Sequence, residues 1–119
     1  MYGFNSLGNL PITGSLIQII KFGKFQTWFD TSNHWSIQVM NKCEILKNET
    51  IISEYDNIKG WNNNLFQEII EKEIIELKIL NDDQMKIVLC EKYEIKLFDD
   101  DKHYESLMIT GPENKWMVI

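Results

Sequence analysis

Residues 73–98 have the sequence EIIELKILNDDQMKIVLCEKYEIKLF, which carries the clearest structural pattern in the chain. Apolar and polar residues alternate in three successive segments, as they do in half-buried β-strands, and turn formers separate these segments. Strands are expected at 75–79, 85–89 and 93–97, and turns between them at 81–83 and 91–92. A further strand at 104–109 continues a spacing of about 8–12 residues, so the pattern predicts an antiparallel meander.

Within the first of these segments, the alternation also predicts which side chains share a face. One face should hold Ile75, Leu77 and Ile79. The other face should hold Glu76 and Lys78, because successive side chains of a strand point to opposite sides of the sheet.

The first half of the chain predicts further strands and then one helix. The strands are expected at 15–22, 25–29, 35–39, 45–46 and 50–53. Asn64 and Gln67 have a spacing close to that of a capping box. The apolar residues that follow Asn64 repeat at i,i+4 and form a stripe, namely Leu65, Phe66, Ile69 and Ile70. We therefore predict a mainly β (α+β) fold, with antiparallel β meander sheets and one short central helix of about two turns.

The composition indicates one globular domain over residues 1–119. The chain is 44% hydrophobic and 25% charged, which is ordinary for a folded protein. Its 12 basic residues are all lysines, its 18 acidic residues outnumber them, and the formal net charge is -6. An acidic chain without arginine disfavours direct nucleic-acid binding, because neutralising phosphates requires clustered cations.

The N-terminal residues and the cysteines predict a reduced, cytoplasmic protein. Residues 1–8 lack a basic region, and Gln18 interrupts the apolar stretch 16–20, so neither a secretory signal nor a membrane span is expected. Two cysteines are too few for a disulfide framework in so short a chain. We expect Cys43 and Cys90 to be small core residues.

No sequence motif supports catalysis, a cofactor or a metal. His34 and His103 stand far apart and fit no zinc-ligand spacing. Residues 99–101 with His103 and Glu105 form the densest ionisable cluster, but the glycine-bearing pattern of a calcium loop does not follow. This cluster is interpreted as a solvated turn, or as an acidic patch that meets a basic partner. We therefore expect no enzyme.

Trp61 lies between glycine and asparagine residues, in a segment that predicts a loop. An exposed tryptophan in such a loop is a plausible interface hot spot. Structural packing of the indole is the alternative interpretation.

The order of segments from residue 35 to residue 119 resembles the small, mostly β immunity proteins found beside bacterial polymorphic and contact-dependent-inhibition toxins. A strand at 35–39 is followed by an irregular stretch and then by LFQEIIEKEI, residues 65–74, with a helix-to-strand step. In that family the step resembles Leu-x-x-Leu-Ile-Gly-Lys-x-Ile, and a Tyr-Glu-x-Trp type of strand comes near the end. Glu71 stands at the glycine position of this chain, and Leu107 stands at the tryptophan position.

The resemblance implies an immunity protein that binds and neutralises the C-terminal domain of a cognate bacterial toxin. Many such toxins are basic nucleases, and an acidic inhibitor is steered to a basic target by its charge. The turns at 81–83 and 99–101 are separated by one hairpin, so they are expected at the same end of the sheet. We call this predicted contact surface the acidic rim. The candidate toxin-binding residues are Asp82, Asp83, Asp99, Asp100, Asp101, Glu105 and Trp61.

The residues also leave a second interpretation open. The chain can be a non-enzymatic β module that binds a small ligand or a cellular protein. It can also form a homodimer, because the edges of an open meander must be covered or paired. A ligand-binding module predicts a sizeable apolar cavity with a few converging polar groups.

Overall fold

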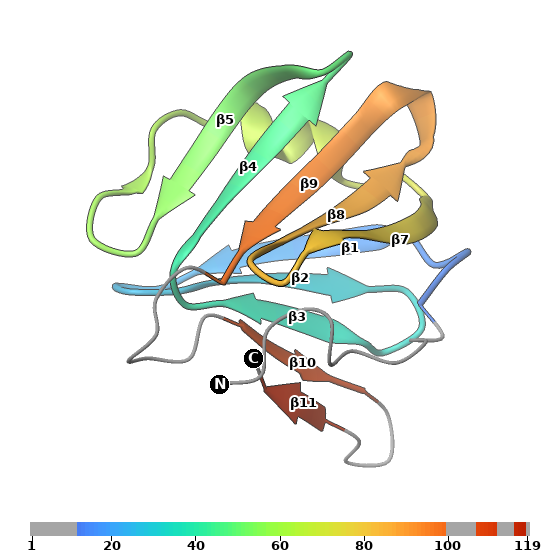
Figure 1. Ribbon diagram of the computed structural model, residues 1–119, viewed down its shortest axis with the longest axis horizontal. Coiled ribbons are helices and arrows are strands. Elements are labelled where there is room, and N and C mark those ends of the chain that lie inside the picture. Colours follow the sequence, from blue (N-terminus) through green and yellow to red (C-terminus); the bar gives the residue numbers. More distant parts are fainter. Residues whose placement is uncertain (1–11, 100–106, 112–115, 119) are drawn as a thin grey trace.

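The computed structural model describes residues 12–99 and 107–111, and the backbone of residues 116–118. Their strands form two antiparallel sheets that face each other (Figure 1). The elements are β1 (Ile17–Phe22), β2 (Thr27–Thr31), β3 (Ser36–Val39), β4 (Lys42–Lys47), β5 (Thr50–Asp56), β6 (Gly60–Trp61), η2 (Leu65–Ile69), β7 (Ile74–Asn81), β8 (Gln84–Leu89), η3 (Cys90–Lys92), β9 (Tyr93–Phe98), β10 (Leu107–Thr110) and β11 (Trp116–Val118). The five-stranded sheet has the order β1-β2-β3-β10-β11, and the six-stranded sheet has the order β6-β5-β4-β9-β8-β7.

The inner faces of the two sheets share one hydrophobic core. Phe29 and Ile37 enter it from the five-stranded sheet, and Ile45, Ile87 and Ile95 enter it from the six-stranded sheet. All five side chains are fully buried. Each sits at an alternate position of its strand, so the period of two in the sequence is the direct cause of this core.

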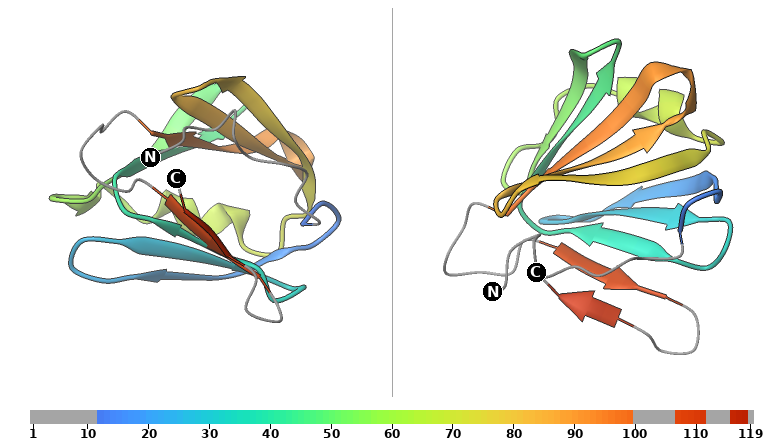
Figure 2. Two further views of the ribbon diagram at one scale, coloured as in Figure 1. Left: turned by 60° about the horizontal axis from the view of Figure 1, so that its bottom comes forward. Right: turned by 45° about the vertical axis from the view of Figure 1, so that its right-hand side comes forward.

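The sheets are joined along two sides. Two residues connect β3 to β4, so the chain passes directly from one sheet to the other. Elsewhere, residues 14–17 pair with residues 71–74 through backbone hydrogen bonds, and we call this pairing the clasp. In it, the Gly14 N–H donates to the Ile74 carbonyl at 2.7 Å and the Ile74 N–H donates to the Ser15 carbonyl at 2.8 Å. Figure 2 shows the two sheets from two further directions, with η2 between them.

The predicted meander is confirmed for three strands and is wrong for the fourth. β7, β8 and β9 are successive antiparallel neighbours. β10 lies in the other sheet, where it pairs with β3. The physical reason is that β4 already occupies the second edge of β9, with Ile45 opposite Ile95. With β8 on its other side, β9 has no free edge, so the strand after it cannot pair with it.

The prediction of a short central α-helix is also wrong, because residues 65–69 form only a turn of 3-10 helix. Its hydrogen bonds run from the Gln67 N–H to the Asn64 carbonyl and from the Ile70 N–H to the Gln67 carbonyl, each three residues back. Phe66 and Ile69, which are also three residues apart, are the two buried side chains. The helix stops early because Ile70 is extended and Glu71 has φ 71°. Within the described ranges, no helix is long and apolar enough to cross a membrane.

The predicted faces of β7 are correct for Leu77 and Ile79 and wrong for Ile75. Leu77 lies opposite Ile87 and Ile79 lies opposite Met85, so both share the inner face. The register shifts between Ile74 and Glu76, and this bulge removes Ile75 from the alternation. Ile75 is 46% exposed as a result.

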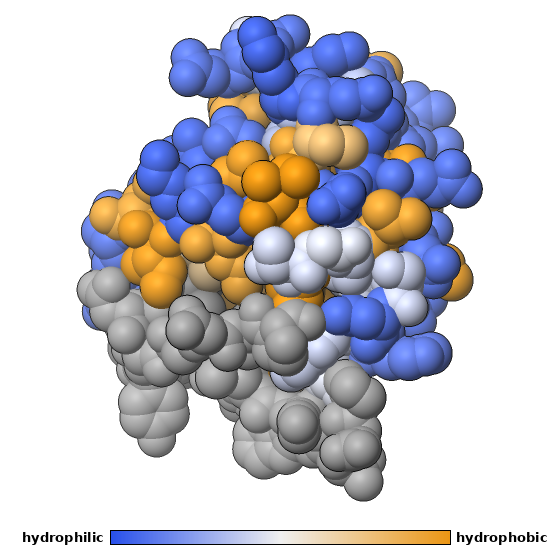
Figure 3. Space-filling model, turned by 90° about the vertical axis from the view of Figure 1, so that its right-hand side faces the viewer, coloured by the Kyte–Doolittle hydropathy of each residue, from blue (hydrophilic) through white to orange (hydrophobic). Residues whose placement is uncertain are grey.

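Figure 3, which views the side at the right of Figure 1, shows apolar surface among hydrophilic side chains.

Candidate functional site

The turn at 81–83 and Asp99, the one described residue of the predicted turn at 99–101, lie at the same end of the six-stranded sheet. Asp82 and Asp83 are exposed in the turn between β7 and β8, where the Asn81 Oδ1 accepts the Asp83 N–H at 2.8 Å. The Asp99 N–H donates to the Asp83 carbonyl at 2.8 Å, which holds the end of β9 beside this turn.

Not every predicted rim residue adds its charge to that surface. Asp99 is only 4% exposed, so its carboxylate points away from solvent. Asp100, Asp101 and Glu105 lie outside the described residues. Asp82 and Asp83 therefore carry the exposed charge of the acidic rim within the described part of the chain.

Trp61 lies in the short strand β6 and is half-buried, so the segment predicted as a loop belongs partly to a sheet. The indole ring stacks on Phe66 with a centroid distance of 4.3 Å and an interplanar angle of 22°. The indole ring also packs against the rings of Tyr55 and Phe29, with centroid distances of 5.4 Å and 6.3 Å. Its Nε1–H donates to the Thr27 Oγ1 at 3.3 Å. These contacts correspond to the packing interpretation and tie β6 to β2 of the opposite sheet.

The opposite end of the six-stranded sheet has two tight turns that sequence reasoning did not identify as unusual. Asn48 and Glu49 have φ 52° and 66°, and Glu91 and Lys92 have φ 60° and 66°. Positive φ at both central residues is typical of type I′ hairpin turns, which usually contain asparagine or glycine. The Asn48 N–H donates to the Lys92 carbonyl at 3.0 Å and joins the two turns. Of these four residues, only Asn48 is of a type that commonly signals a left-handed turn.

Charged side chains surround these turns. Lys72 forms an ion pair with Glu91, and the Tyr93 hydroxyl donates to the Glu68 carboxylate at 2.6 Å. The hydrogen bond from Lys72 lowers the pKa of the Glu91 carboxyl and, through the same contact, raises the pKa of the Lys72 ammonium. Beside them is a hollow of about 430 Å³, lined by Asn48, Glu49, Val88, Lys92, Tyr93 and Glu94.

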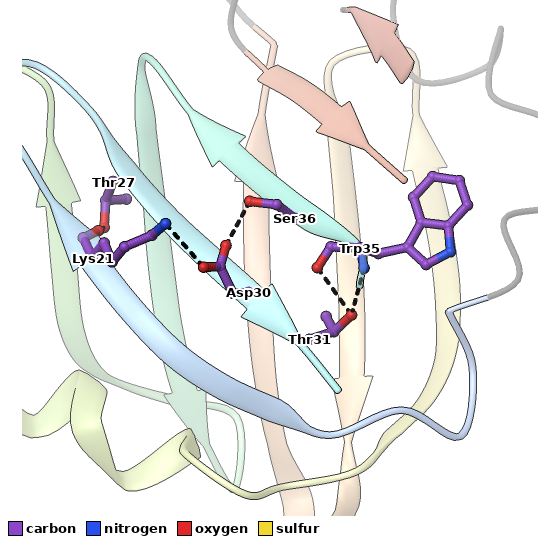
Figure 4. Close-up of polar contacts among 6 residues, drawn as sticks. All are labelled: Lys21, Thr27, Asp30, Thr31, Trp35 and Ser36. Atoms are coloured by element: carbon purple, nitrogen blue, oxygen red, sulfur yellow. Dashed lines mark hydrogen bonds and ion pairs between the residues drawn. The ribbon is translucent and has the colours of Figure 1, made fainter. Parts of the chain in front are cut away.

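A second hollow, of about 500 Å³, lies on the outer face of the five-stranded sheet. Lys21, Asp30 and Ser36 come from three adjacent strands and point toward one another (Figure 4). The Asp30 carboxylate accepts a hydrogen bond from the Ser36 hydroxyl at 2.6 Å and pairs with the Lys21 ammonium at 3.0 Å. Trp28 and Trp35 also line the hollow. The arrangement can hold a polar ligand by hydrogen bonds.

The remaining histidine and cysteine side chains of the described residues lie on separate elements. Among residues 12–99 and 107–111, no three histidine, cysteine or acidic side chains gather as metal ligands. Cys43 and Cys90 are free cysteines. Complete burial of Cys43 raises the pKa of its thiol above the ordinary range, as is typical of a structural core cysteine. His34 is exposed in the turn between β2 and β3, and His103 lies outside these ranges.

Comparison of the chain with protein-family models, with curated proteins and with solved structures finds no match in any of the three.

Proposed function

We propose that this protein is an immunity protein, which binds the C-terminal domain of a cognate bacterial toxin in the cytoplasm and blocks it. The expected toxin is a basic nuclease, because such an enzyme must attract phosphate and an acidic inhibitor imitates that charge. The protein works by occupying a surface, so it needs no catalytic residue of its own.

The observation that carries this proposal is the conformation of Glu71. This residue stands at the glycine position of the helix-to-strand step in the resembling family, and its φ of 71° is left-handed. Glycine adopts that conformation without steric cost, whereas a glutamate does so only when the surrounding structure demands it. Glu71 therefore has a backbone conformation that favours glycine, the residue at this position in the resembling family. The Glu71 N–H also donates to the Ile17 carbonyl in the clasp.

The acidic rim is the proposed contact surface. Its support is the hydrogen bond from the Asp99 N–H to the Asp83 carbonyl, which joins the end of β9 to the turn at 81–83. The net charge of -6 gives the long-range attraction, and the rim gives it a direction.

The test uses co-production of this chain with the toxic C-terminal domain encoded by the adjacent upstream gene. We expect restored growth of the producing cells and one-to-one binding in calorimetry, with a nanomolar or lower dissociation constant. Absence of any protein partner at micromolar concentrations would contradict the proposal.

Charge reversal tests the acidic rim separately. In the variant with Asp82→Lys and Asp83→Lys, we expect the association rate to fall by about tenfold and its salt dependence to weaken. The matched control carries Glu49→Lys and Glu71→Lys, which change the net charge by the same amount. Both residues lie at the opposite end of the sheet. Both positions are left-handed, and lysine, like glutamate, is a long side chain there. Equal slowing in both variants would show that net charge acts alone, without a rim.

The hollow that contains Asp30 favours a second candidate function, a module that binds a small polar ligand. Its volume of about 500 Å³ is suitable for such a ligand, and its polar groups converge from three strands. Asp30→Ala would abolish ligand binding under this alternative and would leave toxin neutralisation unchanged under the first proposal.

A further inference from the structure

The edge of the six-stranded sheet formed by β7 is exposed and apolar. β7 is the terminal strand of this sheet, and its outer edge is paired only at its start, where the clasp engages Glu73 and Ile74. From Ile75 onward, no other described segment pairs with that edge. Ile75, Ile79 and Leu80 are exposed apolar residues on β7. An edge of this kind is a template for pairing with another strand.

The sequence of this edge is complementary to itself. Residues 75–79 are Ile-Glu-Leu-Lys-Ile, which has the same order of chemical classes in both directions except that acid and base exchange places. In an antiparallel pair centred on Leu77, Glu76 of one copy lies opposite Lys78 of the other, twice. Leu77 of one copy lies opposite Leu77 of the other. Opposite charges and apolar pairs at directly facing positions stabilise antiparallel strands.

The cross-strand neighbours of Lys78 give an independent reason for a partner with a negative charge. Lys78 lies directly opposite Lys86, and Lys86 lies directly opposite Lys96. Like charges at facing positions are destabilising. Lys86 pairs with Glu94 at 3.6 Å and Lys96 lies opposite Glu44, so Lys78 is the lysine of this row that faces only another lysine. Within the described part of the chain, neither Lys78 nor Glu76 takes part in an ion pair. A glutamate on the outer side of Lys78 would offset the repulsion.

The bulges of β7 define how far such pairing extends. The register with β8 shifts between Ile74 and Glu76 and again between Ile79 and Asn81, so the regular segment is Glu76–Ile79. At the start of β7, the clasp occupies the position that a longer partner strand would need. Both limits leave residues 76–79 free to pair and exclude a longer contact.

We infer that two copies of this chain associate through antiparallel pairing of β7 with β7, centred on Leu77 and selected by the two Glu76–Lys78 contacts. The interface is short compared with standard interfaces of roughly 800 Å² per partner, so the dimer is weak and concentration-dependent. This surface is separate from the acidic rim, and the inference does not depend on the proposed function.

Charge variants test the pairing in sedimentation velocity experiments over a range of protein concentrations. We expect Glu76→Lys or Lys78→Glu alone to raise the dimer dissociation constant by about tenfold or more, because each creates two like-charge pairs. The double variant, with both substitutions, should regain the wild-type dissociation constant. Lys59→Glu, in the exposed turn before β6, is the matched control and should change nothing.

A mixture of the two single variants is the sharpest test. The Glu76→Lys chain presents two lysines and the Lys78→Glu chain presents two glutamates, so the mixture should form heterodimers although neither chain associates alone. A wild-type chain that stays monomeric at the highest concentration would overturn the inference. So would a mixture that associates no better than its components.

Disulfide trapping provides a second measurement that does not rely on charge variants. In a Cys90→Ser background, Leu77→Cys places two thiols at the symmetry axis, where facing Cα atoms are about 4.5–5.5 Å apart. Ile79→Cys places them several residues apart. We expect a crosslinked dimer for the first variant only, and equal crosslinking of both variants would overturn the register.

Discussion

β7 and β8 are neighbouring strands with the same alternation of apolar and polar residues, and their burial differs. Met85, Ile87 and Leu89 of β8 are at most 2% exposed, whereas Ile79 of β7, directly opposite Met85, is 39% exposed. β8 has a strand on each side, and β7 has one neighbour over most of its length. Alternation therefore determines the strand and its faces, while the position within the sheet determines how much of the apolar face is buried.

The largest expected effect comes from single truncations of two residues that face each other directly, Ile87 of β8 and Leu77 of β7. Ile87→Ala should lower the free energy of unfolding by about 2–5 kcal/mol, because it leaves a cavity in a fully buried site. Leu77→Ala removes a similar volume from the half-buried partner and should cost about 1–2 kcal/mol. Urea denaturation at low protein concentration measures both values. Equal losses would mean that β7 is as well packed as β8.

A smaller effect, of opposite sign, is expected at the turn that ends β8. Lys92→Gly should raise the free energy of unfolding by about 0.5–1 kcal/mol, because glycine relieves the left-handed strain at φ 66°. Lys86→Gly, the same substitution in the extended middle of β8, should instead lower it by about 1 kcal/mol. Thermal denaturation of the two variants gives the comparison, and a loss of stability in Lys92→Gly would contradict the strain argument.

The smallest effect concerns the ion pair between Lys72, which precedes β7, and Glu91, which follows β8. Lys72 lowers the pKa of Glu91, so this contact stabilises the fold above the ordinary glutamate pKa. The stabilisation is lost as the pH falls through the lowered pKa. Glu91→Gln should therefore differ from the wild type at pH 7 and converge with it as the pH falls below the ordinary glutamate pKa. High salt should shrink the difference at pH 7, since the pair is exposed.

The sequence was sufficient for most strands and insufficient for features that depend on distant neighbours. Alternation at Ile37, Ile87 and Ile95 predicted strands with a buried face, because that pattern is local. The 3-10 turn at Leu65–Ile69 was not predictable, since the chain must leave the helix to reach the clasp. The bulge at Ile75 was also not predictable from the sequence, because it shifts the register of β7 so that the strand pairs with both β8 and the clasp.

The candidate site was predictable in part for the same reason. One hairpin between two acidic segments predicted them at the same end of the sheet, and among the described residues Asp99 does contact Asp83 there. The burial of Asp99 and the stacking of Trp61 on Phe66 depend on tertiary neighbours that no local pattern specifies. Left-handed turns at Glu91 and Lys92 lacked the glycine or asparagine that normally signals them.

The clasp has a consequence for the order in which the protein folds. β7, β8 and β9 are connected by short turns, so their contacts close small loops at little entropic cost. Gly14 and Ile74, by contrast, stand sixty positions apart and meet only after most of the chain is ordered. We expect the three-stranded meander to belong to the folding nucleus. For mutations in it, the ratio of the change in folding activation free energy to the change in stability should be about 0.5–0.8. The clasp should form after the rate-limiting step. Weakening the clasp would then shorten the lifetime of the native state and leave the rate of folding almost unchanged.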